Sequence, residues 1–149
     1  YHPKKLFVGN FIGSPEMNII EGTISKRSSN KIEFISNKGF KITFPKHLSE
    51  KIKVPFQDSL EVYWGIRPEN FRIPRASEYE DIPRLELFVE VTESLGPSTL
   101  ALCVLGGHEL RISIPEPHRP KRGETITLDW RSRHLYLFDK KTQKSLVDI

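Results

Sequence analysis

The side chains that could do chemistry in this sequence are histidines, one cysteine and two basic segments. Five histidines are scattered along the chain: His2, His47, His108, His118 and His134. They show no His-x-x-x-His spacing, and a single cysteine, Cys103, cannot form a Cys-x-x-Cys pair or a disulfide within the chain. The spacing therefore predicts no metal site.

The motifs of common catalytic classes are absent from the sequence. No Gly-Lys dipeptide occurs, which excludes the phosphate loop G-x-x-x-x-G-K-[ST] that cradles ATP. The chain also lacks a G-x-S-x-G nucleophile elbow, and the spacing of its acidic residues nominates no pair for general acid–base catalysis. We predict no catalytic residue, metal ligand or cofactor site in this chain.

The basic segments His118–Arg122 and Arg131–His134, in a chain of pI about 9.2, could suit a groove for single-stranded nucleic acid. Stacking on bases would then require exposed aromatic side chains. Most aromatics instead fall on the apolar faces of expected strands: Phe34, Phe40, Phe44, Trp64 and Trp130. Three point to the opposite face: Tyr63, Phe88 and Tyr136. We expect no nucleic-acid partner and keep nucleic-acid binding as an alternative.

Length and composition predict one globular domain or two very small ones. The chain has 149 residues, a net charge of +4, 28% charged residues and 37% hydrophobic residues. It contains no run of roughly 18 apolar residues that could span a membrane. Because the chain begins with neither Met nor a targeting segment, we expect it to be a piece of something longer. Cys103 lies in an apolar run over residues 100–105, which predicts a buried thiol.

The pattern of apolar residues predicts one short helix followed by strands. Pro3 and Gly13 bracket an apolar stripe typical of a short helix. Alternating apolar residues then predict strands around 32–34, 40–44, 60–66, 85–91, 100–104, 110–114, 126–130 and 135–137. Asn37-Lys38-Gly39 and Gly106-Gly107 are turn signals, residues 47–52 could form one helical turn, and the polar stretch 73–83 is typical of a linker or surface loop.

Two segments of the chain are repeated, which indicates a duplicated β-unit. Residues 37–45 parallel 105–115, and residues 66–73 parallel 130–137. Each unit is so small that it would bury only about 60% of its unfolded surface. We therefore expect two units, over 17–74 and 84–149 with a linker at 75–83, that share a core, interleave strands or dimerise.

Several short motifs, in this order, resemble a known family. They are Phe11–Asn18 with its Gly13-Ser14-Pro15, Gly65–Glu69 with its Arg67-Pro68-Glu69, His118-Arg119-Pro120, and Leu135–Asp139. The chain is similar along nearly all its length to the C-terminal part of the ATP-binding subunits of ABC importers for maltose, other oligosaccharides and glycerol phosphate. The resemblance implies that residues 1–16 hold the last helix and joint of a nucleotide-binding domain, and the rest a transport-associated OB-like (TOBE, MOP-like) regulatory domain.

The resemblance carries implications for fold, function and partners. It implies a mainly β fold of two OB-like β-barrel units sharing a core, with a short N-terminal helix. It implies a regulatory and dimerisation role without catalysis, ATP and Mg being bound by the absent nucleotide-binding domain. The implied partners are a second copy, its own nucleotide-binding domain, permease subunits and a regulatory protein, at the cytoplasmic face of the plasma membrane.

The same resemblance suggests interface residues. Gly123, before the penultimate strand, and Phe138, after the last, correspond to positions near the family's regulatory-domain dimer contact. The family's Asp-Pro-Glu at the last turn is Arg131-Ser132-Arg133 here, which reverses the local charge. Read without the resemblance, Arg67-Pro68-Glu69 is a charged turn that closes a barrel. A domain that binds an oxyanion or sugar is a further alternative, since related OB-like units of molybdate transporters bind molybdate.

Overall fold

The computed structural model describes residues 17–27, 30–53, 59–75 and 82–147. The first half of the chain forms β1 (Asn18–Lys26), β2 (Ile32–Ser36), β3 (Lys41–Phe44), the one-turn helix α1 (Lys46–Ser49), β4 (Ser59–Ile66), the 3-10 turn η2 (Pro68–Asn70) and β5 (Phe71–Arg72). The second half forms β6 (Leu85–Ser94), β7 (Ser98–Leu105), β8 (His108–Pro115), β9 (Thr125–Trp130), the 3-10 turn η3 (Ser132–His134) and β10 (Tyr136–Asp139).

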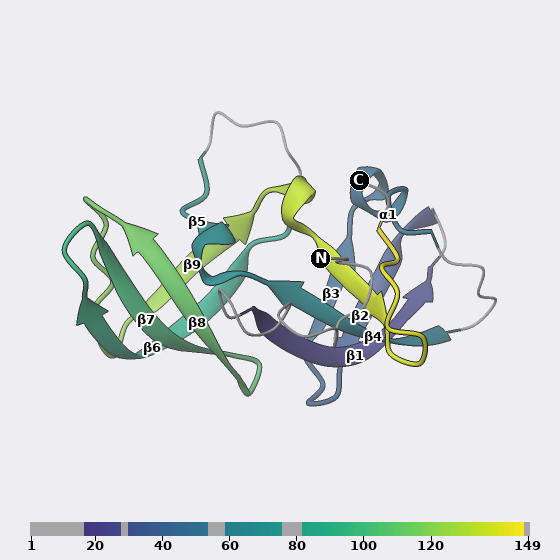
Figure 1. The fold of residues 1–149 in the computed structure, drawn as a ribbon, viewed down its shortest axis with the longest axis horizontal. Coiled ribbons are helices and arrows are strands. Elements are labelled where there is room, and N and C mark those ends of the chain that lie inside the picture. Colours follow the sequence, from purple (N-terminus) through teal and green to yellow (C-terminus); the bar gives the residue numbers. More distant parts are fainter. Residues whose placement is uncertain (1–16, 28–29, 54–58, 76–81, 148–149) are drawn as a thin grey trace.

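The strands form two five-stranded antiparallel sheets that lie side by side in Figure 1. The strand order is β10-β4-β1-β2-β3 in the first sheet and β5-β9-β6-β7-β8 in the second. Within each sheet, buried residues alternate with exposed or half-buried ones, for example over β3 and β8. This alternation is the physical reason that a period of two in the sequence located the strands. The predicted fold class, mainly β, is confirmed.

The two sheets exchange one strand each. The chain leaves β4 of the first sheet, passes through η2 and enters β5, which pairs with β9 of the second sheet. It later leaves β9, passes through η3 and enters β10, which pairs with β4 of the first sheet. The residues before the two turns, Arg67 and Arg131, have nearly the same backbone angles (φ −74° and −80°, ψ 147° and 143°). The two crossings are the segments 66–73 and 130–137 that repeat in the sequence.

One apolar core runs through both sheets. Its largest members with no exposed surface are Phe34, Phe44, Trp64 and Trp130. Trp64 of β4 and Trp130 of β9 meet with ring centroids 5.3 Å apart. Trp64 also contacts Phe34 and Phe44 edge-on, at 5.3 and 5.9 Å. The predicted core aromatics are confirmed, although Phe40 is only partly buried, and the core is shared as expected.

The two predicted hairpin turns meet each other. Lys38 Nζ donates to the Gly107 carbonyl oxygen at 3.0 Å. Gly106 has φ +54°, and a Cβ there would lie 2.6 Å from Phe40 Cβ, so only glycine fits this contact. The second repeated segment therefore also lies where the two sheets touch.

Other predictions concern local elements. The helical turn expected within 47–52 is α1, which begins at Lys46 and ends at Ser49. Tyr63, Phe88 and Tyr136 are outside the shared core as predicted, Phe88 being 46% exposed. The short N-terminal helix and most of the 75–83 linker lie outside the described residues.

A buried histidine predicts how the stability of this junction depends on pH. Ser36 Oγ accepts hydrogen bonds from the backbone N–H groups of Lys38 and Phe40, and lies 2.8 Å from His108 Nε2. Its hydroxyl hydrogen is thus free to donate to a neutral imidazole. Burial, and then the Lys38 cation, lower the pKa of His108.

Because the native pKa is lower than the usual histidine pKa, protonation of His108 favours the unfolded chain. The stability that His108 contributes is therefore fully present above the usual histidine pKa of about 6.5. This stability is lost as the pH falls from about 6.5 towards the lower native pKa. We expect urea unfolding curves to show a greater loss of stability between about pH 7.5 and pH 5.5 in the natural chain than in His108→Gln. Equal pH dependence in both proteins would contradict this role for His108.

Cys103 is expected to be unreactive in the native chain. Its side chain has no exposed surface, and burial, with a smaller contribution from Glu90, raises the pKa of the thiol to about 11. At about pH 8 its thiolate fraction is then more than about a hundred times smaller than that of a free cysteine. Labelling with a chromogenic disulfide should be slow in buffer and fast in denaturant; equally fast labelling in both would show that Cys103 is accessible.

Candidate functional site

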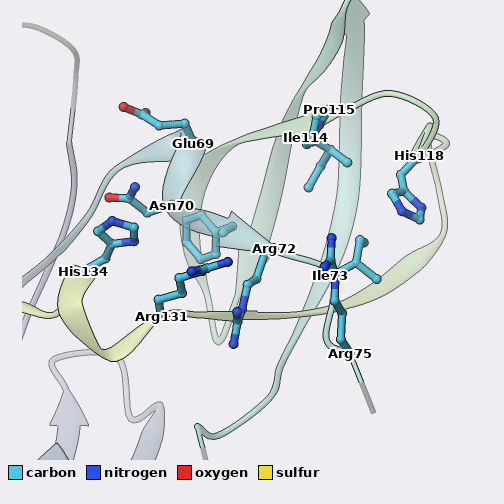
Figure 2. A pocket seen from close by; sticks show the side chains of 11 residues that line it. Glu69, Asn70, Arg72, Ile73, Arg75, Ile114, Pro115, His118, Arg131 and His134 are labelled. Carbon is cyan, nitrogen blue, oxygen red and sulfur yellow. The ribbon is translucent and has the colours of Figure 1, made fainter. Parts of the chain in front are cut away.

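A groove of about 420 Å³ lies where the two sheets exchange strands. The η2–β5 segment, the end of β8, the loop after it, and η3 all contribute to its lining. Figure 2 shows Arg72 and Arg131 near its centre, Asn70 and His134 at one end, and Arg75 and His118 at the other. The strand crossings thus bring together cationic residues that are far apart in the sequence.

Arg72 is held in the floor of the groove by an ion pair. Its Nε donates to Asp129 Oδ1 at 2.7 Å, and the two side chains are 18% and 9% exposed. The residues are direct partners in the β5–β9 ladder. Because both groups are largely removed from water, the pair also fastens the two-residue strand β5 to the second sheet.

Arg75 and Arg131 have no ion-pair partner within the described part of the chain. The lining carboxylate, Glu69, is exposed on η2, and Figure 2 shows its side chain pointing away from both arginines. Among the residues that the structure describes, the lining of the groove consequently carries more positive than negative charge.

The described residues contain no cluster of three or more His, Cys, Asp or Glu side chains able to hold a metal ion. Within the same residues, no helix is long and apolar enough to cross a membrane.

The Arg67-Pro68-Glu69 motif forms the start of η2. Pro68 occupies the first helical position, and Arg67 lies before it with its guanidinium carbon 5.9 Å from the centre of the Tyr136 ring. The motif therefore connects the strand crossing to β10, while Glu69 lines the groove. Gly13, Ser14 and Pro15 lie outside the described residues.

The structure places the two interface candidates on different sheets. Gly123 is exposed in the turn before β9, with φ +89°, and its N–H donates to the Val89 carbonyl oxygen at 2.8 Å. Phe138 was predicted to follow the last strand. It instead lies inside β10 and is 1% exposed. Leu137 fills the shared core, whereas Phe138 packs with Met17 in a second cluster on the other face.

Sequence reasoning identified three of the five arginine and histidine residues that line the groove. It singled out Arg131, His134 and His118 as members of basic segments, but it missed Arg72 and Arg75. A signal for Arg72 was present in the sequence, because segment 66–73 is repeated at 130–137. Two equivalent crossings between the same two sheets are expected to lie near each other. The charged residues of the first crossing, Arg67 and Glu69, were interpreted only as part of a charged turn.

The outward face of the second sheet exposes apolar residues. Phe88 is 46% exposed and Val91 is 55% exposed on β6. Their partners across the ladder, Val104 and Leu102 of β7, are half-buried. An apolar strip on a sheet face is typical of surfaces that contact another protein.

The fold and this junction define a class of small double-unit β proteins in which two sheets exchange strands. Comparison with protein families assigns the chain further: residues 13–71 match the MalK OB fold domain, and residues 64–138 match the TOBE domain. The chain belongs to the TOBE domain family, with OB-type units as expected.

Curated relatives are ABC transporter ATP-binding proteins. The chain is 34% identical to the ABC transporter ATP-binding protein YcjV of Escherichia coli O6:H1, over 95% of this chain and 36% of that protein. It is 32% identical to the sn-glycerol-3-phosphate import ATP-binding protein UgpC of Paraburkholderia xenovorans, over 92% and 36%. It is 25% identical to the ABC transporter ATP-binding protein YurJ of Bacillus subtilis, over 98% of this chain and 39% of that protein. The chain therefore spans less than half the length of these relatives.

Among solved structures, the chain resembles ModG, a cytoplasmic molybdate-binding protein, with a TM-score of 0.59. The similarity covers 80% of this chain and 94% of ModG, at 16% sequence identity. This similarity supports the fold.

Proposed function

We propose that this chain is the regulatory and dimerisation domain of the ATP-binding subunit of an ABC transporter that imports sugars or related solutes. The chain itself performs no catalysis in this proposal. ATP and Mg would bind in a separate nucleotide-binding domain of the same protein, which would contact permease subunits at the cytoplasmic face of the plasma membrane. A regulatory protein could bind the complex through this domain.

The order of the two family matches along one chain is the observation that supports this proposal. A MalK OB fold domain followed by a TOBE domain accounts for residues 13–138, and the relatives are named as ATP-binding proteins. UgpC, whose name specifies glycerol phosphate import, supports the class of solute.

The shared core suits a domain that acts as a clamp, holding two ATP-binding subunits together. Because the sheets exchange β5 and β10 and share one core, the two units resist separation under load. A two-fold contact between copies could then stay closed while attached ATPase domains open and close. Tethering of this kind raises the local concentration of each ATPase domain near the other.

For the contact between copies, we propose the outward face of β6 and β7. Phe88 and Val91 supply exposed apolar surface, and the Gly123 turn is hydrogen-bonded to the neighbouring Val89. This surface therefore combines Gly123, the exposed interface candidate from the family resemblance, with the apolar strip of Phe88 and Val91. Phe138, being buried in β10 of the first sheet, supplies no surface to this contact.

The proposal is tested first by the genomic sequence upstream of Tyr1. We expect the same reading frame to encode a domain with a phosphate loop; a natural start codon immediately before Tyr1 would contradict the assignment. The full-length protein should then hydrolyse ATP, and deleting residues 17–149 should weaken pairing of its ATPase domains without abolishing it. Nucleotide turnover by the 149-residue chain alone would refute the non-catalytic role.

The alternatives predict different binding results. Micromolar binding of molybdate or a sugar in calorimetry would favour a small-ligand domain, the alternative that the molybdate-binding neighbour supports. Nucleic-acid binding predicts retention of single-stranded oligonucleotides that falls steeply with salt. The regulatory assignment predicts neither result.

A further inference from the structure

The positive charge in the groove at the strand crossings has no evident structural use. Arg72 is satisfied by Asp129, but Arg75 and Arg131 form no ion pair within the described ranges. They approach the groove from opposite crossings, and His118 lines its far end (Figure 2). Guanidinium groups that line one groove without ion-pair partners among the described residues are a suitable environment for an anion.

The apolar surface of the groove near these cations comes from Ile73, which is half-buried and lines the groove. Phe71 and Ile114 also line it but are only 2% and 1% exposed, so they contribute almost no surface to a ligand. A volume of about 420 Å³ is within the range of small-molecule sites. The combination suits a compact anion attached to a small organic group.

Phosphate suits this arrangement better than a neutral sugar or a nucleic-acid strand does. Its oxygens can accept two parallel hydrogen bonds from one guanidinium, whereas a neutral sugar offers arginine no charge. A nucleic-acid strand would need exposed aromatic rings for stacking, and the aromatic ring lining the groove, Phe71, is buried.

We propose that this groove binds a small soluble phosphate monoester. Arg131 and Arg75 hold the phosphate oxygens, and the apolar wall of Ile73 contacts the organic part. The inference does not depend on the proposed function, because the groove lies within one chain and can bind whether or not two chains associate.

Isothermal titration calorimetry on the 149-residue chain tests this site with glucose 6-phosphate and, as a neutral match, glucose. Glucose 6-phosphate is expected to bind at least about tenfold more tightly than glucose. Arg131→Gln should weaken glucose 6-phosphate binding at least about tenfold. Arg133→Gln is the matched control, because Arg133 is exposed on η3 and does not line the groove; its effect should stay below about twofold.

Three results would overturn the proposal. The first is no binding of glucose 6-phosphate by the natural chain in the millimolar range. The second is an equal loss of binding in both arginine variants, which would indicate unspecific charge attraction. Retention on phosphatidic acid vesicles that needs Arg131, without binding of glucose 6-phosphate, would assign the groove to a lipid headgroup instead. Because Arg131 is exposed, thermal unfolding of Arg131→Gln should match that of the natural chain, so lost binding would not reflect misfolding.

Discussion

Replacing Trp130 by alanine is expected to lower the free energy of unfolding by about 4 kcal/mol. The Trp130 side chain has no exposed surface and contacts Trp64 of the other sheet at a centroid distance of 5.3 Å. A domain of this size is stable by only about 5–15 kcal/mol, so the variant would lose a large part of its stability. Urea unfolding followed by circular dichroism measures the change.

Because Trp130 belongs to the second sheet and Trp64 to the first, both sheets should still unfold together in one transition. Phe88→Ala is the aromatic control, since Phe88 is 46% exposed; at low protein concentration it should change stability by less than about 1 kcal/mol. Equal losses in the two variants, or a first sheet that unfolds separately in Trp130→Ala, would argue against a shared core.

Breaking the Arg72–Asp129 ion pair should have the second largest effect. Asp129→Ala removes the carboxylate from an arginine that is only 18% exposed, which is expected to cost about 3 kcal/mol. The loss should appear in urea unfolding curves and should loosen β5, which pairs with β9 through these residues.

A double-mutant cycle separates the ion pair from lost packing. Arg72→Met alone leaves the carboxylate of Asp129 without this partner, whereas Arg72→Met with Asp129→Ala removes both charges. The double variant is expected to be more stable than the sum of the single losses predicts, by about 1–2 kcal/mol. Strictly additive losses would show that the two side chains do not stabilise each other.

Most strands could be predicted from the sequence because each buries one face, although β1 (Asn18–Lys26) was not among those predicted. Alternation over residues such as Ile42 and Phe44, or Leu110 and Ile112, gives a period of two that survives in the structure. The turns at Gly39 and Gly106 were also recognisable, since both require positive φ. Local patterns therefore gave the elements.

The pairing of the sheets could not be predicted from the same patterns. β5 has only two residues, Phe71 and Arg72, which is too short for periodicity to identify it as a strand of the other sheet. Phe138 was placed after the last strand because Leu137 marks one buried face of β10, while burial of the opposite face depends on Met17, distant in sequence. The repeat was recognised, but a repeat alone does not say which strands pair.

The groove illustrates the same limit for a site. Arg72 and Arg131 are brought together by two strand crossings, and no single segment contains both. A residue pattern can identify a basic segment, yet which other side chains lie around it is a property of the folded chain.

Sedimentation equilibrium of the 149-residue chain over a wide concentration range tests the proposed clamp most directly. We predict an average mass that rises from 17.3 kDa towards that of two copies, with the rise shifted to higher concentration in Phe88→Arg. A mass that stays at 17.3 kDa at every concentration would contradict the claim that this domain pairs ATP-binding subunits.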